Sequence, residues 1–311
     1  MIQRDARAAL GQDHRAGASE LVAFAAAACR AALAETGPDP APLARALRRV
    51  CHAQPSMGAV LRLASRVLEV AETAKRRGDD AGHAEDEISL ALDQFVADFE
   101  DAGHAIVEHG LDVFPASGWA ATHSRSSLVE AVFLEVARRH RPVQVLLSES
   151  RPLLEGRDLA RRLAEAKIPC WLTVDAAAAL LLPRAAVLLV GADAVLPKTF
   201  VNKVGTYALL LAARELNVPA YALAQRAKFL PASVGLFELG ERDPEQVWKD
   251  GALGVSVRNP TFEECPLGLV RGVIAESGIL LPNEAGVAAG ETSLAEPLLA
   301  PWSKADEVDE D

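Results

Sequence analysis

The segment from Val190 to Leu210 brings an acid, an amide and a cation into one short stretch. Asp193 ends an apolar run typical of a buried strand, and Asn202 and Lys203 stand directly before an apolar run typical of a helix. In open α/β sheets, ligands bind at the carboxyl ends of the strands. We therefore expect Asp193, Asn202 and Lys203 to face a ligand, with residues 202–206 opening the helix.

A second group of polar side chains runs from Thr122 to Ser127. Thr122, Ser124, Ser126 and Ser127 supply hydroxyls, and Arg125 supplies a positive charge, directly before another apolar helix pattern. Hydroxyls and the free amides of a helix start can hold a phosphate. The alternative is that Ser126 or Ser127 only caps the helix.

A third group lies near the amino terminus, where Arg15, Gly17 and Ala18 precede a helix that we expect from about Glu20. One interpretation is a phosphate held by Arg15 and backbone amides. The other is an ordinary helix cap at Ser19.

Acidic side chains follow several predicted strands, with Glu149, Asp175 and Asp193 each at a strand's carboxyl end. A carboxylate beside a sheet must be hydrogen-bonded or paired. Because the carboxyl ends of parallel strands share one edge, we expect these acids to converge on one mouth, with Lys203 as their partner. A single acid at a strand end is more often structural.

Two parts of the chain with different sequence patterns must position these groups. Residues 1–105 have helical periodicity throughout, interrupted at prolines 38–42 and at residues 78–82, which predicts a bundle of roughly four helices. Residues 106–290 alternate short apolar runs with helical stretches, which predicts βαβ units and a parallel sheet. The predicted strands are Val143–Leu147, Cys170–Val174, Ala186–Val190 and Ala220–Ala224.

The carboxyl-terminal third is less regular. Residues 238–258 are predicted to form an excursion, after which the chain returns through Asn259-Pro260 to a last helix that ends near Pro282. Residues 291–311 form an acidic tail, which we expect to be disordered because it ends in a polar, charged run.

Composition excludes several function classes. The formal net charge of −11 argues against a general nucleic-acid binder, because neutralising phosphates requires a basic face. Charges interrupt every apolar run before it reaches the length of a membrane span, and the first residues lack the apolar stretch of a secretory signal. The four cysteines and seven histidines show no ligand spacing. We therefore expect a cytoplasmic protein without metal or cofactor.

Five motifs follow one another along the chain. They are Thr122-His123-Ser124 with Ser126, Ser150-Arg151-Pro152 with Glu155-Gly156, Gly191-Ala192-Asp193, Asn202-Lys203-Val204-Gly205-Thr206, and Arg258-Asn259-Pro260 with Phe262 and Pro266. In this order, from about residue 13 to 282, they resemble the superfamily of the α, β and δ subunits of translation initiation factor 2B. This superfamily includes methylthioribose-1-phosphate isomerase and ribose-1,5-bisphosphate isomerase.

The resemblance implies a helical amino-terminal domain, a Rossmann-like α/β carboxyl-terminal domain, dimerisation through the latter, and a sugar-phosphate pocket between the two. In the isomerase members a cysteine and an aspartate shuttle protons, and Asp193 corresponds to the aspartate. Ser124 stands at the position of the cysteine. A serine hydroxyl is a far weaker acid than a thiol and needs an adjacent base, and no such base is evident. Gln54 also stands where isomerase members tend to carry an arginine, before Pro55.

Three functions follow from this combination. The first is a sugar-phosphate or nucleotide-monophosphate binder of the initiation-factor 2B type without turnover, because Ser124 replaces the cysteine. The alternative is an aldose-ketose isomerase acting on a phosphorylated ribose derivative, with Asp193 and Ser124 as the candidate catalytic positions. The third is a structural subunit whose pocket binds nothing.

Overall fold

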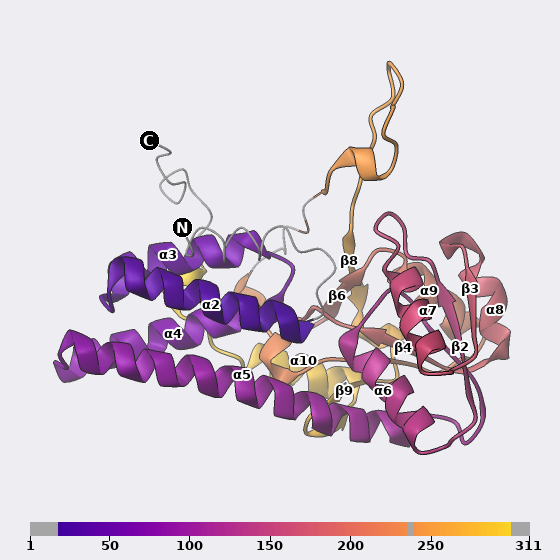
Figure 1. The fold of residues 1–311 in the computed structure, drawn as a ribbon, viewed down its shortest axis with the longest axis horizontal. Coiled ribbons are helices and arrows are strands. Elements are labelled where there is room, and N and C mark those ends of the chain that lie inside the picture. The colour runs from indigo at the N-terminus through magenta and orange to yellow at the C-terminus, as the bar shows by residue number, and fades with distance from the viewer. Residues whose placement is uncertain (1–17, 235–238, 240, 300–311) are drawn as a thin grey trace.

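The computed structural model describes residues 18–234, 239 and 241–299, which form a helical bundle joined to an α/β domain (Figure 1). Arg15 and Gly17, two of the expected phosphate-binding residues, lie outside the described residues, as do residues 300–311 of the expected tail. The architecture confirms the expected fold class, a helical amino-terminal part followed by a mostly parallel, Rossmann-like sheet. No helix in the described ranges is long and apolar enough to cross a membrane.

The bundle contains four described helices, whose ends are set by local chemistry. Asp39 caps α3 by accepting a hydrogen bond from Ala41 N, and Asp80 caps α5 in the same way through His83 N. Gly78 ends α4 in the left-handed region, with φ of 76°. The helices are α2 (Ala18–Thr36), α3 (Pro40–Ala53), α4 (Gly58–Arg77) and α5 (Ala81–Asp112).

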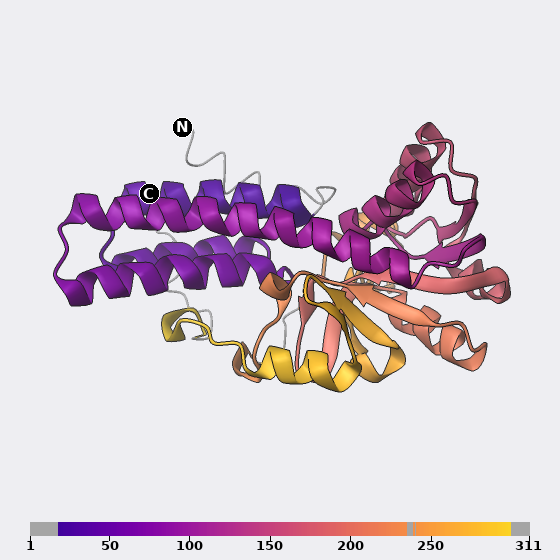
Figure 2. The ribbon, with the colours of Figure 1, turned by 90° about the horizontal axis from the view of Figure 1, so that it is seen from below.

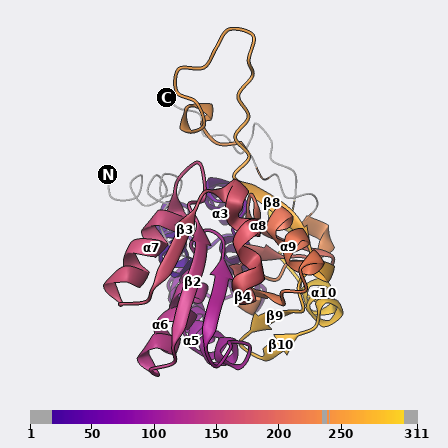
Figure 3. The same cartoon turned by 90° about the vertical axis from the view of Figure 1, so that its right-hand side faces the viewer.

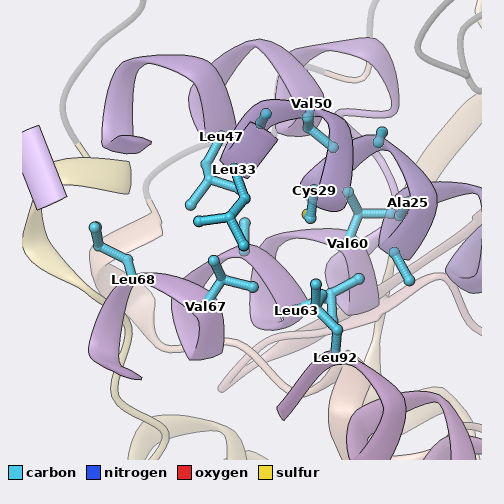
Figure 4. Close-up of a cluster of buried hydrophobic side chains, with 14 of the residues drawn as sticks. Ala25, Cys29, Leu33, Leu47, Val50, Val60, Leu63, Val67, Leu68 and Leu92 are labelled. Carbon is cyan, nitrogen blue, oxygen red and sulfur yellow. The ribbon is translucent and has the colours of Figure 1, made fainter. Parts of the chain in front are cut away.

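Apolar side chains from all four helices meet in one core (Figure 4). Leu33, Leu47, Leu63 and Leu92 come from different helices and are all buried. Helix α5 does not stop at the predicted domain boundary of residue 105 but continues to Asp112 alongside the α/β domain (Figure 2). Its last turns carry Ile106 and Leu111, which pack in the core of that domain.

The main sheet has seven strands in the order β10-β9-β7-β4-β1-β2-β3, and all adjacent pairs are parallel except β10 with β9. The chain builds outward from β1 through β2 to β3, then returns to β4 on the other side of β1. This reversal between β1 and β4 is the topological switch point at which such sheets bind ligands. The strands are β1 (Gly118–Thr122), β2 (Val143–Ser148), β3 (Cys170–Thr173), β4 (Ala185–Gly191), β7 (Ala220–Leu223), β9 (Gly272–Ala275) and β10 (Gly278–Leu280).

Helices cover both faces of this sheet, so its central strands are apolar on both sides. Val145 and Leu147 of β2 belong to a core shared with α5, α6 and α7, whereas Leu146 belongs to a core shared with α8, α9 and α10. The helices are α6 (Ser127–Arg138), α7 (Glu155–Glu165), α8 (Ala178–Leu181), α9 (Thr206–Glu215) and α10 (Pro282–Gly290).

A second, three-stranded antiparallel sheet corrects two predictions. Its strands are β5 (Ala194–Val195), β6 (Thr199–Lys203) and β8 (Phe262–Pro266). Asn202 and Lys203, predicted to open a helix, lie in β6, and α9 begins only after Gly205, whose φ is 101°. The predicted last helix before Pro282 is also wrong. That region forms β8, β9 and β10, and Pro282 begins α10, because proline suits the first turn of a helix.

Residues 241–259 form the predicted excursion, an arm that projects away from both domains (Figures 1 and 3). The first residues of the predicted tail instead return to the bundle. Arg62 of α4 donates to Ser293 O, Ala295 N donates to Ser65 Oγ of the same helix, and Arg48 of α3 donates to Pro297 O. This carboxyl-terminal segment therefore connects the bundle to α10.

The start of α7 packs directly on the end of β2, and this contact positions Glu155. A Cβ on Gly156 would lie 1.8 Å from the carbonyl oxygen of Ser148. We expect Gly156→Ala to lower the free energy of unfolding by about 3 kcal/mol, because backbone atoms cannot move aside as a flexible side chain can. Urea denaturation measures this.

Gly290→Ala is the matched control, because a Cβ on that α10 glycine would meet nothing within 4 Å. If both variants had the same free energy of unfolding, the close packing of α7 on β2 would be contradicted.

Candidate functional site

A cavity of about 110 Å³ opens at the switch point, between the α/β domain and the bundle. The loops after β1 and β4 form one side, β6 and the segment after β7 form the base, and α2 with the α3–α4 connection closes it from the bundle. The lining residues include Ala18, Leu21, Gln54, Ser56, Met57, Ser124, Arg125, Ser126, Ser127, Glu155, Gly191, Ala192, Asp193, Asn202, Lys203, Lys228, Arg242, Thr261 and Phe262.

The start of α6 forms the wall of the cavity after β1. Ser126 is the N-cap of this helix, and its Oγ accepts a hydrogen bond from Val129 N at 3.5 Å. The same side chain packs against Gly191, the last residue of β4, where a Cβ would lie 2.8 Å from Ser126 Oγ. Ser126 therefore caps the helix, which was one of the two alternatives, and it also lines the cavity. Only glycine allows the loops after β1 and β4 to approach so closely.

Arg125 lies at the edge of this wall, and an acid orients it. Its Nε donates to Glu130 Oε2 at 3.1 Å, and Glu130 Oε1 accepts from Arg162 at 3.0 Å. The carboxylate of Glu130 is buried between the two guanidinium groups. The arginine thus keeps a defined direction beside the helix start.

Asp193 and Lys228 both line the cavity, and their opposite charges attract each other. Burial raises the pKa of the Asp193 carboxyl, and the ammonium groups of Lys228 and Lys203 oppose this rise. Burial lowers the pKa of Lys228, and the charge on Asp193 opposes that shift. Lys228 Nζ also donates to Ala192 O at 2.8 Å, which braces the loop after β4.

The sequence reasoning did not select Lys228. The sequence did offer one sign of its role. Lys228 follows shortly after the predicted strand Ala220–Ala224, and the carboxyl end of that strand lies at the same sheet edge as the cavity. Arg242 and Thr261 were also missed. They reach the cavity from the two ends of the projecting arm, which no local pattern indicates.

Lys203 pairs with a different acid from those predicted. Its Nζ lies 2.7 Å from Glu155 Oε1 at the start of α7, and both side chains are largely buried. Asn202, the residue before it, donates to Thr206 Oγ1 at 2.9 Å, and that hydroxyl donates to Lys203 O at 2.6 Å. These bonds fix the turn between β6 and α9.

Several predicted residues lie outside the cavity lining. Glu149 pairs with Arg157 at 2.5 Å. Asp175 accepts hydrogen bonds from the backbone amides of Ser150 and Arg151, each at 2.7 Å, so it stabilises the turn after β2. Thr122 is buried beside a separate small cavity. Of the three strand-end acids, only Asp193 lines the main cavity, so the expected convergence of all three is not observed.

His123 is the histidine that the sequence places nearest the mouth, and it is engaged elsewhere. Nε2 lies 2.8 Å from Val204 O, and because a carbonyl only accepts, Nε2 carries the proton. Nδ1 then accepts from Ser148 Oγ at 2.7 Å. Burial lowers the pKa of the ring, which favours this neutral form. Among the described lining residues there is thus neither an imidazole nor a thiol beside Ser124.

The described residues contain one group with metal-ligand chemistry, Asp79, His83 and Glu87 at the turn between α4 and α5. The guanidinium of Arg77 already pairs with Asp79 and Glu87. None of these four side chains lines the main cavity.

Comparison with known proteins identifies the family. Residues 15–282 match the model of the initiation factor 2 subunit family. A methylthioribose-1-phosphate isomerase of Chloroflexus aurantiacus is 33% identical over 241 residues, covering 70% of this chain and 68% of that protein. A ribose 1,5-bisphosphate isomerase of Archaeoglobus fulgidus is 32% identical over 200 residues, covering 62% and 63%.

A solved structure agrees with these matches. The crystal structure of the Pyrococcus horikoshii OT3 translation initiation factor eIF-2B superimposes with a TM-score of 0.78 and 28% identity, covering 90% of this chain and 97% of that one. The resemblance inferred from the five motifs is confirmed, and the chain belongs to the initiation factor 2 subunit family.

Proposed function

We propose that this chain binds a phosphorylated sugar or a nucleotide monophosphate in the cavity and does not convert it. The observation that carries the proposal is the charge of the lining. Four basic side chains, Arg125, Lys203, Lys228 and Arg242, outnumber the acids Glu155 and Asp193. A basic cavity in a chain of net charge −11 favours an anionic ligand.

The start of α6 is the proposed phosphate site. A helix amino terminus has amides directed outward and carries a partial positive charge, so it suits a phosphate. Ser124, Ser126 and Ser127 line the cavity at this point, and the guanidinium of Arg125 lies beside them. The named relatives that act on sugar phosphates support this ligand class.

The absence of turnover is proposed from Ser124. Moving a proton between adjacent carbons needs groups that give and take protons near neutral pH. Burial raises the pKa of Asp193 in the direction that this chemistry needs, but the hydroxyl of Ser124 replaces the thiol expected from the isomerase pattern. The nearest histidine, His123, uses both ring nitrogens elsewhere.

The isomerase alternative has one specific observation in its favour. Asp193 lines the cavity, and its pKa is raised by burial, as a carboxyl that exchanges protons near neutral pH requires. In that function Asp193 moves the proton between adjacent carbons of the open-chain sugar, and the bundle excludes water from the reaction.

Binding tests the charge argument. We expect Arg125→Met to weaken binding of ribose 5-phosphate by about 1.5–3 kcal/mol, because a charge-assisted hydrogen bond is lost. Isothermal titration calorimetry measures it. Arg161→Met is the control, because Arg161 pairs with Asp158 and does not line the cavity. If both variants bind ribose 5-phosphate as tightly as the unaltered chain does, Arg125 is not part of the phosphate site.

Turnover tests the role of Ser124. The unaltered chain, incubated with ribose 1,5-bisphosphate or methylthioribose 1-phosphate, is expected to give no isomer by proton NMR. Ser124→Cys is expected to gain activity, since a thiol supplies the missing acid–base group. Steady conversion by the unaltered chain would establish the isomerase alternative, and Asp193→Asn would then have to abolish it.

We further propose a homodimer formed through the α/β domain. Large apolar side chains are exposed there, with Trp171 and Leu172 on the edge strand β3 and Trp248 and Leu253 on the arm. Exposed apolar groups of this kind are typical of interaction surfaces. Sedimentation velocity should show a dimer, and a monomer at micromolar concentration would refute the proposal.

A further inference from the structure

A second groove lies on the helical bundle, between α4 and α5, which run side by side (Figure 1). Its volume is about 160 Å³, and it shares no lining residue with the main cavity. Charged and apolar side chains line it together. They are Arg62, Arg66 and Glu69 of α4 and Ala91, Phe95 and Asp98 of α5.

The two arginines have no acid as a hydrogen-bond partner among the described residues. Arg62 donates to the carbonyl oxygen of Ser293 at 2.8 Å, and Arg66 makes no hydrogen bond or ion pair with a described residue. Burial lowers the pKa of the Arg62 guanidinium, and Glu69 opposes this shift while Arg226 adds to it. A bound carboxylate beside Arg62 and Arg66 would offset positive charge that the bundle leaves uncompensated.

The two acids of the groove accept only from neutral donors in the described part of the chain. Glu69 Oε1 accepts from Ser65 Oγ at 2.9 Å, and Asp98 Oδ1 accepts from Gln94 Nε2 at 2.7 Å. An ionised carboxylate has about four lone-pair sites, so both acids can accept further hydrogen bonds. Opposite charges thus line one groove without pairing with each other.

The carboxyl-terminal segment fixes one side of the groove. Arg62 donates to Ser293 in this segment, and Ser65 Oγ, which donates to Glu69, accepts from Ala295 N at 2.8 Å. Side chains that are held in advance lose less conformational entropy when a ligand binds. This side of the groove is therefore preformed.

The balance of charge restricts the class of ligand. Two cations face two acids here, whereas in the main cavity the basic side chains outnumber the acids. A phosphate would be repelled by Glu69 and Asp98, and a simple cation would be repelled by the arginines. A small molecule with one carboxylate and one ammonium group avoids both repulsions. Phe95 adds an apolar surface for the rest of such a molecule.

We propose that the groove between α4 and α5 binds an α-amino acid with an apolar side chain. The carboxylate of the amino acid pairs with Arg62 and Arg66, and its ammonium group pairs with Glu69 and Asp98. Its side chain packs on Phe95. The site is independent of the proposed function, because it lies outside the main cavity.

Isothermal titration calorimetry on the full chain, near neutral pH, tests this with three probes of similar shape. L-leucine carries both charges, 4-methylpentanoate keeps only the carboxylate, and L-leucinamide keeps only the ammonium group. We expect leucine to bind and each analogue to bind about tenfold more weakly or worse, because each loses one set of charge-assisted hydrogen bonds.

Single variants place the binding in the groove. Arg66→Met and Asp98→Asn each remove one charge at an exposed helical position, and each should weaken leucine binding about fivefold or more. Arg76→Met on α4 and Asp86→Asn on α5 are the matched controls, because neither residue lines the groove. Both controls should bind leucine as the unaltered chain does.

Each other outcome overturns the proposal. If 4-methylpentanoate binds as tightly as leucine, the acids play no part in recognition. If leucine does not bind, or binds Arg66→Met as tightly as the unaltered chain, the groove is not an amino-acid site. Failure here leaves the proposed function untouched, because Arg66→Met should not change the affinity for ribose 5-phosphate in the main cavity.

Discussion

One backbone hydrogen bond holds the cavity together, from Gly58 N at the start of α4 to Asp193 O after β4, at 2.9 Å. A Cβ on Gly58 would lie 2.9 Å from the carbonyl oxygen of Lys228, so the bundle also approaches the segment after β7 as closely as backbones allow. The bond joins the two domains at the residue that carries the candidate acid. The cavity depends on it, because the bundle side and the sheet side meet there.

The arrangement of charge in the cavity follows from the same closeness. The charges of Lys228, Lys203 and Glu155 act on the ionisation of Asp193, and the charge of Asp193 acts on that of Lys228, within a site that burial keeps poorly screened. Each acid has a lysine nearby, and Arg125 is held by Glu130 at the rim. The chain thus keeps several buried charges without leaving any of these acids isolated.

Much of this could be predicted from the sequence, because its strongest patterns are local. The periodicity of α2 to α5 and the apolar runs of β2, β3, β4 and β7 identified these elements, and five motifs identified the family. The partners could not be predicted in the same way. Lys203 meets Glu155, which is 48 positions away, and β6 pairs with β8 across more than that. Such pairings depend on how separate elements pack, which no run of residues records.

The crossing of the carboxyl-terminal segment to the bundle bears on the order of folding during synthesis. Ala295 belongs to the bundle's own apolar core and bonds to Ser65 across 230 positions of sequence. A ribosome releases the four helices long before it releases this residue. The bundle therefore emerges before the α/β domain but is completed only after it. Until then, part of its apolar surface on α3 and α4 stays accessible to chaperones.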